Sequence, residues 1–372
     1  MRVLSFSFEN YRNLKPGALK ADESTNIICG QNAQGKTNLL EAVWLFTGGR
    51  SFRGARDKEL VSMENPHAPC TLRMRFESGG REQESVLTLT GGRRHAEKNG
   101  VALKTPGELI GAFCAVLFSP DHLSLVKEGP AVRRAFLDAA LCQIRPAYAK
   151  ILSQYTRTLQ QRGALLKDIP YHGELMDLLE VWDERLIRLG ARILFERARY
   201  TAALQRQAVP VYEGISSGRE TLEIAYQSTV APDSSDLTQL QWEQCFWEKL
   251  RAARREDLLT GSTGVGPHRD ELMLSVNGLL ARSFGSQGQQ RSVVLALKLG
   301  EANVMAQSIG EEPVILLDDV LSELDDSRQE YLLNHMKERQ VFFTCCDPSG
   351  IRLLRDGKVF YMKEGCLTGA PL

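Results

Sequence analysis

The stretch Gly30-Gln31-Asn32-Ala33-Gln34-Gly35-Lys36-Thr37 is the part of the chain whose residue types and spacing indicate chemistry most directly. It follows an apolar run at 26–29 and precedes apolar residues with helical spacing at 39–44. A strand, a glycine-rich turn and a helix in this order bind phosphate, because backbone N–H groups at the helix start can face one phosphate cluster. Lys36 would contact the β- and γ-phosphates, and Thr37 would be a ligand of Mg²⁺. A glycine turn before an ordinary helix is the alternative, but the context favours a site in which all eight residues contact a nucleoside triphosphate.

Two adjacent carboxylates, Asp318 and Asp319, end an apolar run at 314–317. At the end of a buried parallel strand, Asp318 could hold Mg²⁺ together with Thr37, and Asp319 could orient or deprotonate an attacking water. A strand that ends in a solvated acidic turn is the alternative. The complete phosphate loop upstream favours the metal site.

A third motif, Ser286-Gln287-Gly288-Gln289, stands before a predicted helix and upstream of the acidic strand. Ser286 could cap that helix, and Gly288 would let the backbone approach an anion closely. Such a sequence usually marks only a helix cap. Its order relative to the phosphate loop and the carboxylates makes it informative.

The composition is that of an ordinary globular protein of two or three domains. The 372 residues are 43% hydrophobic and 25% charged, with a formal net charge of zero. A nucleic acid would therefore have to bind a local basic patch. Eight cysteines without a C-x-x-C pair indicate a reducing compartment rather than a zinc site or a disulfide framework. No signal-peptide core and no apolar run of membrane-spanning length are present, so we expect a cytoplasmic protein without a membrane partner.

The pattern of strands and helices predicts one α/β domain, residues 1–119 and 261–372, split by a mostly helical insertion at 120–260. Residues 132–208 have helical spacing, and Pro210 is expected to end that stretch. Asn277-Gly278 predicts a two-residue hairpin. Strands are expected at 3–9, 26–29, 72–77, 86–89, 113–118, 222–226, 272–276, 279–283, 314–317, 341–344 and 359–362, and further helices at 240–250, 293–306 and 331–337.

Together these motifs resemble the ATP-binding-cassette (ABC) ATPases, in the branch with heads like those of the structural-maintenance-of-chromosomes (SMC) proteins. Residues 321–325 are similar to the D-loop of that superfamily. Within the branch, the chain is most similar to the RecF family of bacterial recombination mediators, over essentially its full length. The stretches that carry this resemblance lie at 10–13, 51–53, 118–123, 133–138, 266–270 and 318–325.

The resemblance implies an ABC-type P-loop ATPase head split by a helical lid, with roles for particular residues. Lys36 and Asp319 would act in hydrolysis, and Arg12 would reach the bound nucleotide. Ser286, Gly288 and Gln289 would form a signature motif that contacts the γ-phosphate held by a second subunit. Ser322 and Asp325 would belong to the D-loop.

The resemblance also implies a biological role. A slow, DNA-stimulated ATPase would use ATP and Mg²⁺ to dimerise on gapped, single-stranded or double-stranded DNA. It would work with RecO and RecR to load RecA, and would support replication restart and the SOS response.

The sequence departs from the superfamily pattern in three places. Asp319 stands where a glutamate is common, which is compatible with slow hydrolysis. No switch histidine follows the strand at 341–344, where Cys345-Cys346-Asp347 stands instead. No Q-loop glutamine follows the strand at 113–118, and Asp121 and His122 are the candidates to substitute for it.

Arginines are the expected DNA contacts, and affinity would come mainly from phosphate contacts. The favoured candidates are Arg53, Arg56, Arg133 and Arg134, with further candidates at Arg50, Arg251, Arg254 and Arg255. A solvated charged face is the alternative for each of them. Trp182 and Trp247 are expected in the core rather than as base-stacking platforms.

Two other functional classes compete with this interpretation. A transport ATPase subunit would need a membrane partner, and the long insertion fits it poorly. A small-molecule kinase would use the phosphate loop alone and would have no use for Ser286–Gln289 or for the D-loop-like segment.

Overall fold

The computed structural model describes residues 1–231, 236–346 and 357–370, and the chain forms two compact units. The first unit contains residues 1–122 and 301–372, and the second contains residues 123–300. The second unit thus begins close to the predicted insertion but continues past residue 260. The assignment of 1–119 and 261–372 to one ATPase head stays a prediction.

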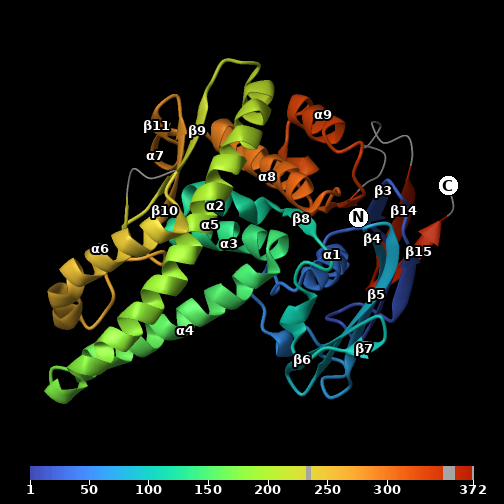
Figure 1. The fold of residues 1–372 in the computed structure, drawn as a ribbon. Helices are drawn as coiled ribbons and strands as arrows, with labels where there is room; N and C mark the ends of the chain where they lie inside the picture. The colour runs from blue at the N-terminus through green and yellow to red at the C-terminus, as the bar shows by residue number, and fades with distance from the viewer. Residues whose placement is uncertain (232–235, 347–356, 371–372) are drawn as a thin grey trace. The chain divides into compact units, whose positions relative to one another are not determined.

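The first unit holds an antiparallel six-stranded sheet in the order β2-β1-β4-β5-β6-β7 (Figure 1). A hairpin turns at Gly79-Gly80, where Ser78 pairs with Arg81. The strands are β1 (Arg2–Glu9), β2 (Gly17–Lys20), β4 (Cys70–Ser78), β5 (Arg81–Thr90), β6 (Arg93–Lys98) and β7 (Val101–Ala102).

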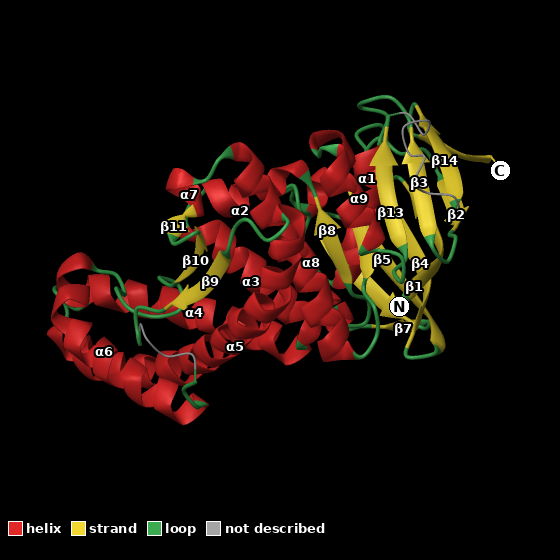
Figure 2. Cartoon of the chain, turned by 90° about the horizontal axis from the view of Figure 1, so that it is seen from above, coloured by secondary structure: helices red, strands yellow, loops and turns green. Residues whose placement is uncertain are grey.

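The other sheet of this unit has the order β15-β14-β3-β13-β12-β8, and all neighbours except β14 and β15 are parallel (Figure 2). Its strands are β3 (Thr25–Cys29), β8 (Ala115–Phe118), β12 (Val314–Leu317), β13 (Val341–Cys345), β14 (Lys358–Lys363) and β15 (Cys366–Ala370). Parallel strands place their carboxyl ends at one edge. The loops after β3 and β12 therefore meet there, next to the end of β13.

Helix α1 (Lys36–Trp44) shares one core with both sheets. Leu40 and Val43 of the helix are fully buried in the same apolar cluster as Phe6 of β1 and Leu316 of β12. Helix α9 (Asp326–Asn334) starts and ends earlier than the helix predicted at 331–337. Short 3-10 turns are η1 (Leu45–Thr47), η2 (Asp57–Glu59), η3 (Pro106–Leu109), η4 (Pro120–Leu123) and η6 (Leu321–Glu323).

The second unit is mainly helical, as predicted for the insertion. Its helices are α2 (Ser124–Lys127), α3 (Pro130–Ile144), α4 (Pro146–Asp168), α5 (Met176–Ser216), α6 (Gln239–Thr260), α7 (Ala281–Phe284) and the first part of α8 (Gln287–Ile309), with the 3-10 turn η5 (Gly173–Leu175). A small sheet has the order β11-β10-β9, with β9 (Leu222–Gln227), β10 (Glu271–Val276) and β11 (Leu279–Leu280).

This sheet explains why the second unit extends past residue 260. Strand β10 pairs along its whole length with β9, so it lies in the second unit rather than in the first. The turn between β10 and β11 is confirmed, since Asn277 and Gly278 both have positive φ angles (51° and 75°). The prediction of a strand at 279–283 is wrong beyond Leu280, because α7 starts at Ala281.

The prediction that Pro210 ends a helix is also wrong, since α5 continues through it to Ser216. A proline inside a helix costs about 3 kcal/mol or more. Burial on both sides of it offsets that cost: Leu204, Ala208 and Tyr212 are fully buried. Packing here outweighs the local preference of proline.

A buried ion-pair network joins three helices of this unit. The Arg162 side chain of α4 is fully buried. It donates to Asp183 of α5 (2.6 Å) and to Asp257 of α6 (2.7 Å). Arg254, a candidate DNA contact, also binds Asp183 (3.0 Å).

Among the described residues, no helix has both the length and the apolarity needed to cross a membrane, and all eight cysteines are free thiols.

We predict that Arg162→Met lowers the free energy of unfolding by about 3–5 kcal/mol, because it leaves the buried Asp257 carboxylate without its cation and removes one of the two arginines that bind Asp183. Chemical denaturation monitored by circular dichroism measures the change. The control is Arg188→Met on the exposed face of α5, with an expected change within about 0.5 kcal/mol. Equal effects of the two variants would contradict a stabilising network.

Candidate nucleotide-binding site

The glycine-rich loop after β3 has the backbone conformation that a phosphate-binding turn needs. Gly35 precedes α1 with φ of 111°, a value that glycine adopts readily. Ala33 also has positive φ (65°), which is rare for a residue with a side chain. The loop is therefore held in a conformation that its sequence alone does not favour, and contacts from elsewhere must stabilise it.

The turn between β14 and β15 supplies those contacts. The backbone N–H of Glu364 donates to Gln34 Oε1 (2.6 Å), and the N–H of Gly365 donates to the Gln34 carbonyl (3.2 Å). A Cβ atom on Gly30 would lie 2.3 Å from the Met362 carbonyl oxygen, so only glycine fits there. The β14–β15 hairpin thus contacts and stabilises the predicted phosphate loop.

Lys36 lies at the first position of α1 with its side chain folded over the loop. Its Nζ donates to the carbonyl oxygens of Gly30 (2.5 Å) and Gln31 (3.0 Å), and the residue is only 7% exposed. The ammonium group is therefore fixed where the loop N–H groups converge. A phosphate in this place would receive both kinds of donor.

Asp318 and Thr37 meet although 281 residues separate them. The Thr37 hydroxyl donates to Asp318 Oδ1 (2.9 Å), and the Thr344 hydroxyl of β13 donates to the same oxygen (3.1 Å). Burial raises the pKa of the Asp318 carboxyl, while these two hydrogen bonds favour its ionised form. The predicted pairing of the phosphate loop with the acidic strand is thus present in the structure.

These oxygens fit a magnesium ion. Mg²⁺ in nucleotide sites is commonly held by one or two protein oxygens together with phosphate oxygens and water. The Thr37 hydroxyl and the Asp318 carboxylate are such a pair. Among the described residues, no group of three or more His, Cys, Asp or Glu side chains could hold a metal without a nucleotide.

Asp319 has an uncommon backbone conformation, with φ of 53°. Its N–H donates to Thr344 Oγ1 (2.9 Å), and Ser322 donates to its carboxylate (3.2 Å). Left-handed conformations of residues other than glycine are costly and concentrate at functional sites. Thr344 therefore holds the Asp318 carboxylate and the Asp319 backbone, and sequence reasoning missed it because its role depends on strand order.

A pocket of about 340 Å³ surrounds these groups. Arg53, predicted as a DNA contact, lies in its wall and donates to Asn38 Oδ1 (2.9 Å). Its guanidinium is exposed and has no carboxylate partner among the described residues. The lining residues are Asn32, Ala33, Gly35, Lys36, Thr37, Asn38, Arg53, Asp319 and Thr344. Arg53 is thus placed for a nucleotide phosphate.

Arg12 is held by Glu41 of α1 instead of lining the pocket. Glu41 is fully buried and accepts four hydrogen bonds: from Tyr11 (2.8 Å), from Arg12 Nε and Nη2 (2.5 and 2.9 Å), and from Ser51 (2.5 Å). Because Ser51 lies two residues before Arg53, the same carboxylate fixes the loop that carries the pocket arginine. Sequence reasoning missed Glu41, which appears there as one acidic residue in a helix.

The signature-like residues lie in the second unit, at the start of α8. Ser286 is exposed and caps the helix: its Oγ accepts from the Gln289 N–H (3.2 Å), and its own N–H donates to Gln289 Oε1 (2.8 Å). Gly288 lies in the first turn. The predicted cap is confirmed, and the contact with a second subunit stays a prediction.

The D-loop-like residues follow Asp319 directly. Ser322 donates to the Asp319 carbonyl (2.9 Å) as well as to its carboxylate. Asp325 caps α9, accepting from the Arg328 N–H (2.9 Å). Both residues are exposed.

The remaining arginine candidates differ in availability. Arg56 is exposed. Arg133 is 5% exposed, and its guanidinium binds both oxygens of Glu271 (2.7 Å each) and two carbonyls, so the structure contradicts a DNA contact there. Arg134 donates to the Asp270 carbonyl (2.8 Å), and burial lowers its pKa.

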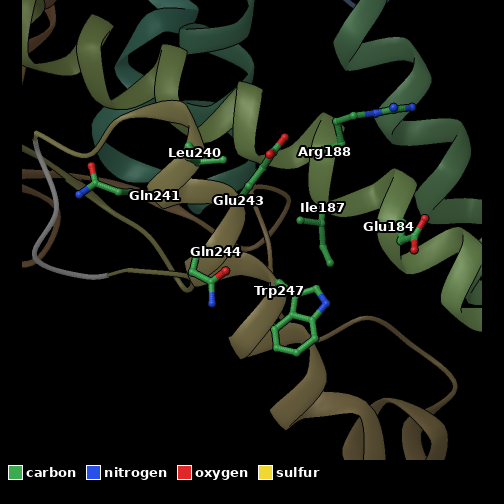
Figure 3. A pocket seen from close by; sticks show the side chains of 8 residues that line it. All are labelled: Glu184, Ile187, Arg188, Leu240, Gln241, Glu243, Gln244 and Trp247. Atoms are coloured by element: carbon green, nitrogen blue, oxygen red, sulfur yellow. The ribbon is translucent and has the colours of Figure 1, made fainter.

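Trp247 is not in the core, contrary to expectation. It is 45% exposed and lines a second hollow between α5 and α6 (Figure 3). The Arg251 guanidinium lies 5.0 Å from its ring centre. Ile187 and Leu240 line the same hollow.

The superfamily has a switch histidine and a Q-loop glutamine at two positions where this chain has other residues, and the structure describes part of both. The Sγ of Cys346 lies 3.7 Å from Lys36 Nζ and 3.1 Å from Asn32 Oδ1, while Asp347 lies outside the described residues. His122 Nδ1 accepts from the Ser119 N–H (3.1 Å), and neither His122 nor Asp121 lines the pocket.

Comparison with known proteins gives consistent matches. Residues 2–356 match the family model described as the RecF/RecN/SMC N terminal domain. The chain is 40% identical to the DNA replication and repair protein RecF of Acetivibrio thermocellus, with 91% of each chain covered. It is 37% identical to RecF of Bacillus cereus strain G9842, with 98% of each covered.

Solved structures agree with these matches. The recombination mediator protein RecF-ATP in the RecFOR pathway superposes with a TM-score of 0.92 at 36% identity, covering 100% of this chain and 98% of that one. The Smc head domain of Pyrococcus furiosus, covering 100% and 96%, gives a TM-score of 0.58 at 16% identity, which shows a likeness of fold alone.

We predict that Glu41→Gln lowers the free energy of unfolding by about 3 kcal/mol or more, because Arg12 donates to both carboxylate oxygens and an amide NH₂ would face one of these donors in either orientation. Thermal and chemical denaturation measure this change. The control is Glu64→Gln, which removes an exposed ion pair with Lys15 (2.6 Å) and should cost less than about 1 kcal/mol. Full stability of the Glu41 variant would contradict its role as an anchor.

Proposed function

Since the chain belongs to the RecF family and has the fold of an SMC-like ABC ATPase, we propose that it binds and slowly hydrolyses ATP in DNA replication and repair. As in the recombination mediator whose structure with ATP it resembles, the nucleotide would lie over the loop after β3. The single observation that carries this proposal is the convergence of Lys36, Thr37, Asp318 and Asp319 at one edge of the parallel sheet.

The binding step follows from charge and geometry. The loop N–H groups and Lys36 would take the β- and γ-phosphates, and Arg53 would contact a phosphate from the other wall of the pocket. Thr37 and Asp318 would hold Mg²⁺, which supplies positive charge against the phosphate oxygens.

Asp319 is the group we assign to the attacking water. Its carboxylate is at the pocket wall and is oriented by Ser322, while its backbone is held by Thr344. It would accept the proton of a water that attacks the γ-phosphorus in line with the leaving ADP oxygen. The short side chain is compatible with a slow reaction.

ATP would also join two copies of the chain. The Ser286 hydroxyl accepts one hydrogen bond from Gln289, and no acceptor among the described residues takes its hydrogen. An exposed donor next to a helix start suits a phosphate oxygen on another subunit. Hydrolysis would remove that phosphate and release the dimer, so ATP acts as a timer.

DNA would bind the dimer mainly through its phosphates, with a steep dependence on salt and little sequence preference. Arg56 is the exposed candidate near the pocket. We further propose that RecO and RecR are partners, and that the complex helps to load RecA on gapped DNA.

We predict that Lys36→Met abolishes ATP-dependent dimers, because it removes the fixed charge under the phosphates. Sedimentation velocity with and without ATP and gapped DNA measures the dimer. A Lys36 variant that dimerises normally on ATP would contradict the mechanism. In the same assay Ser286→Arg should block dimers, whereas Gln307→Arg, on the exposed far end of the same helix, should not.

We predict that Asp319→Asn traps the ATP-bound dimer, because the amide cannot accept the water proton. ATP turnover should fall by a factor of about 100 or more, in the range that general-base catalysis contributes. Phosphate release and sedimentation on the same samples check both effects. Rapid turnover by this variant would show that another group activates the water.

A further inference from the structure

An acidic residue outside the motif, Glu220, contacts the signature-like turn at Ser286 and stabilises it. The Gln289 Nε2 donates to Glu220 Oε1 (2.8 Å). The other oxygen of the same carboxylate, Glu220 Oε2, accepts from the hydroxyl of Tyr212 (2.7 Å). Tyr212 lies near the end of α5 and is fully buried, so this side of the contact is fixed by the core of the second unit.

This contact sets the direction of the Gln289 amide. Its Oε1 accepts from the Ser286 N–H (2.8 Å), so its NH₂ must face the carboxylate. With both ends engaged, the amide cannot turn over. The Gln289 N–H in turn donates to Ser286 Oγ (3.2 Å), which directs the hydroxyl hydrogen away from the helix.

Glu220 itself is well placed by its surroundings. It lies in the loop between α5 and β9, and the Ser216 hydroxyl donates to its carbonyl (3.4 Å). The next residue, Thr221, exchanges hydrogen bonds with Asn277 in the β10–β11 turn (2.9 Å each). Hydrogen bonds therefore connect Glu220 to the end of the 41-residue helix α5 and, through its neighbour Thr221, to the β10–β11 turn.

We propose that Glu220 is a positioning residue for Ser286, which aligns the hydroxyl for the nucleotide of a second copy of the chain. This inference rests on the proposed joining of two subunits by ATP. Its consequence is that the end of α5 and the signature turn move together. A shift of that helix end would withdraw the Glu220 carboxylate from Gln289 and weaken the pairing of subunits without touching the phosphate loop.

The test separates nucleotide binding from pairing. Glu220→Ala, Tyr212→Phe and wild type are compared for affinity toward a fluorescent ATP analogue at protein concentrations below dimerisation, and for the ATP-dependent dimer constant by sedimentation. In Glu220→Ala the analogue should bind within twofold of wild type. The dissociation constant of the ATP-dependent dimer should rise about 10-fold for each of its two nucleotide sites, and so about 100-fold in total. One charge-assisted hydrogen bond is lost at each site.

Two further variants distinguish positioning from stability. Glu220→Gln should restore most of the dimer, because its amide oxygen can still accept from Gln289 and Tyr212 can accept from its NH₂. Glu223→Ala, an exposed glutamate on β9, is the matched control and should behave as wild type. Tyr212→Phe should weaken the dimer less than Glu220→Ala.

The outcomes are separable. Wild-type dimerisation by Glu220→Ala would overturn the inference, and so would a loss of cooperative unfolding in Glu220→Ala that Glu220→Gln shares. If wild type itself does not dimerise on ATP, or if Ser286→Arg dimerises normally, the proposed function fails. Weakened pairing with intact ATP binding and an unchanged melting temperature supports the positioning role.

Discussion

The hydrogen bond between Thr37 and Asp318 is the constraint on which the rest of the site depends. It joins the first turn of α1 to the end of β12, and it forms only if β3, β13 and β12 are neighbours in the correct register. Asp318 is 6% exposed, and burying its charge is unfavourable without partners. The hydroxyls of Thr37 and Thr344 meet that requirement, so folding of the sheet and assembly of the site are one event.

The local parts of this arrangement could be predicted from the sequence, because each follows from a short pattern. A glycine-rich turn between an apolar run and a helix defines the phosphate loop, and an apolar run before two aspartates defines the acidic strand. Thr344 and Glu41 could not be found in the same way, and Arg53 could be predicted only as a DNA contact and not as part of the pocket. The role of Thr344 comes from strand order. The roles of Glu41 and Arg53 come from the buried Glu41 carboxylate, which accepts hydrogen bonds from residues up to 30 positions away in the sequence. Neither cause appears in a local pattern.

The second unit shows where local rules fail. Pro210 should end a helix, but buried neighbours on both sides of it keep α5 continuous. Arg133 reads as one of several basic residues, yet it is a buried partner of Glu271 on β10. The same pairing of β9 with β10 places residues past 260 in the second unit. In each case a long-range contact outweighs a preference that the local sequence indicates.

The charges of the pocket explain why binding would need more than the loop. Lys36 and Arg53 bring two positive charges, and Asp318 and Asp319 bring two negative ones. Side chains alone therefore leave no net attraction for a triphosphate, and the start of α1 adds only a partial positive charge. The missing attraction must come from a cation that arrives with the nucleotide and from donors outside this pocket. Ser286, exposed and with an uncommitted hydrogen in the described structure, is a donor of that kind. A pocket that is incomplete by itself would make the proposed pairing of two chains depend on ATP.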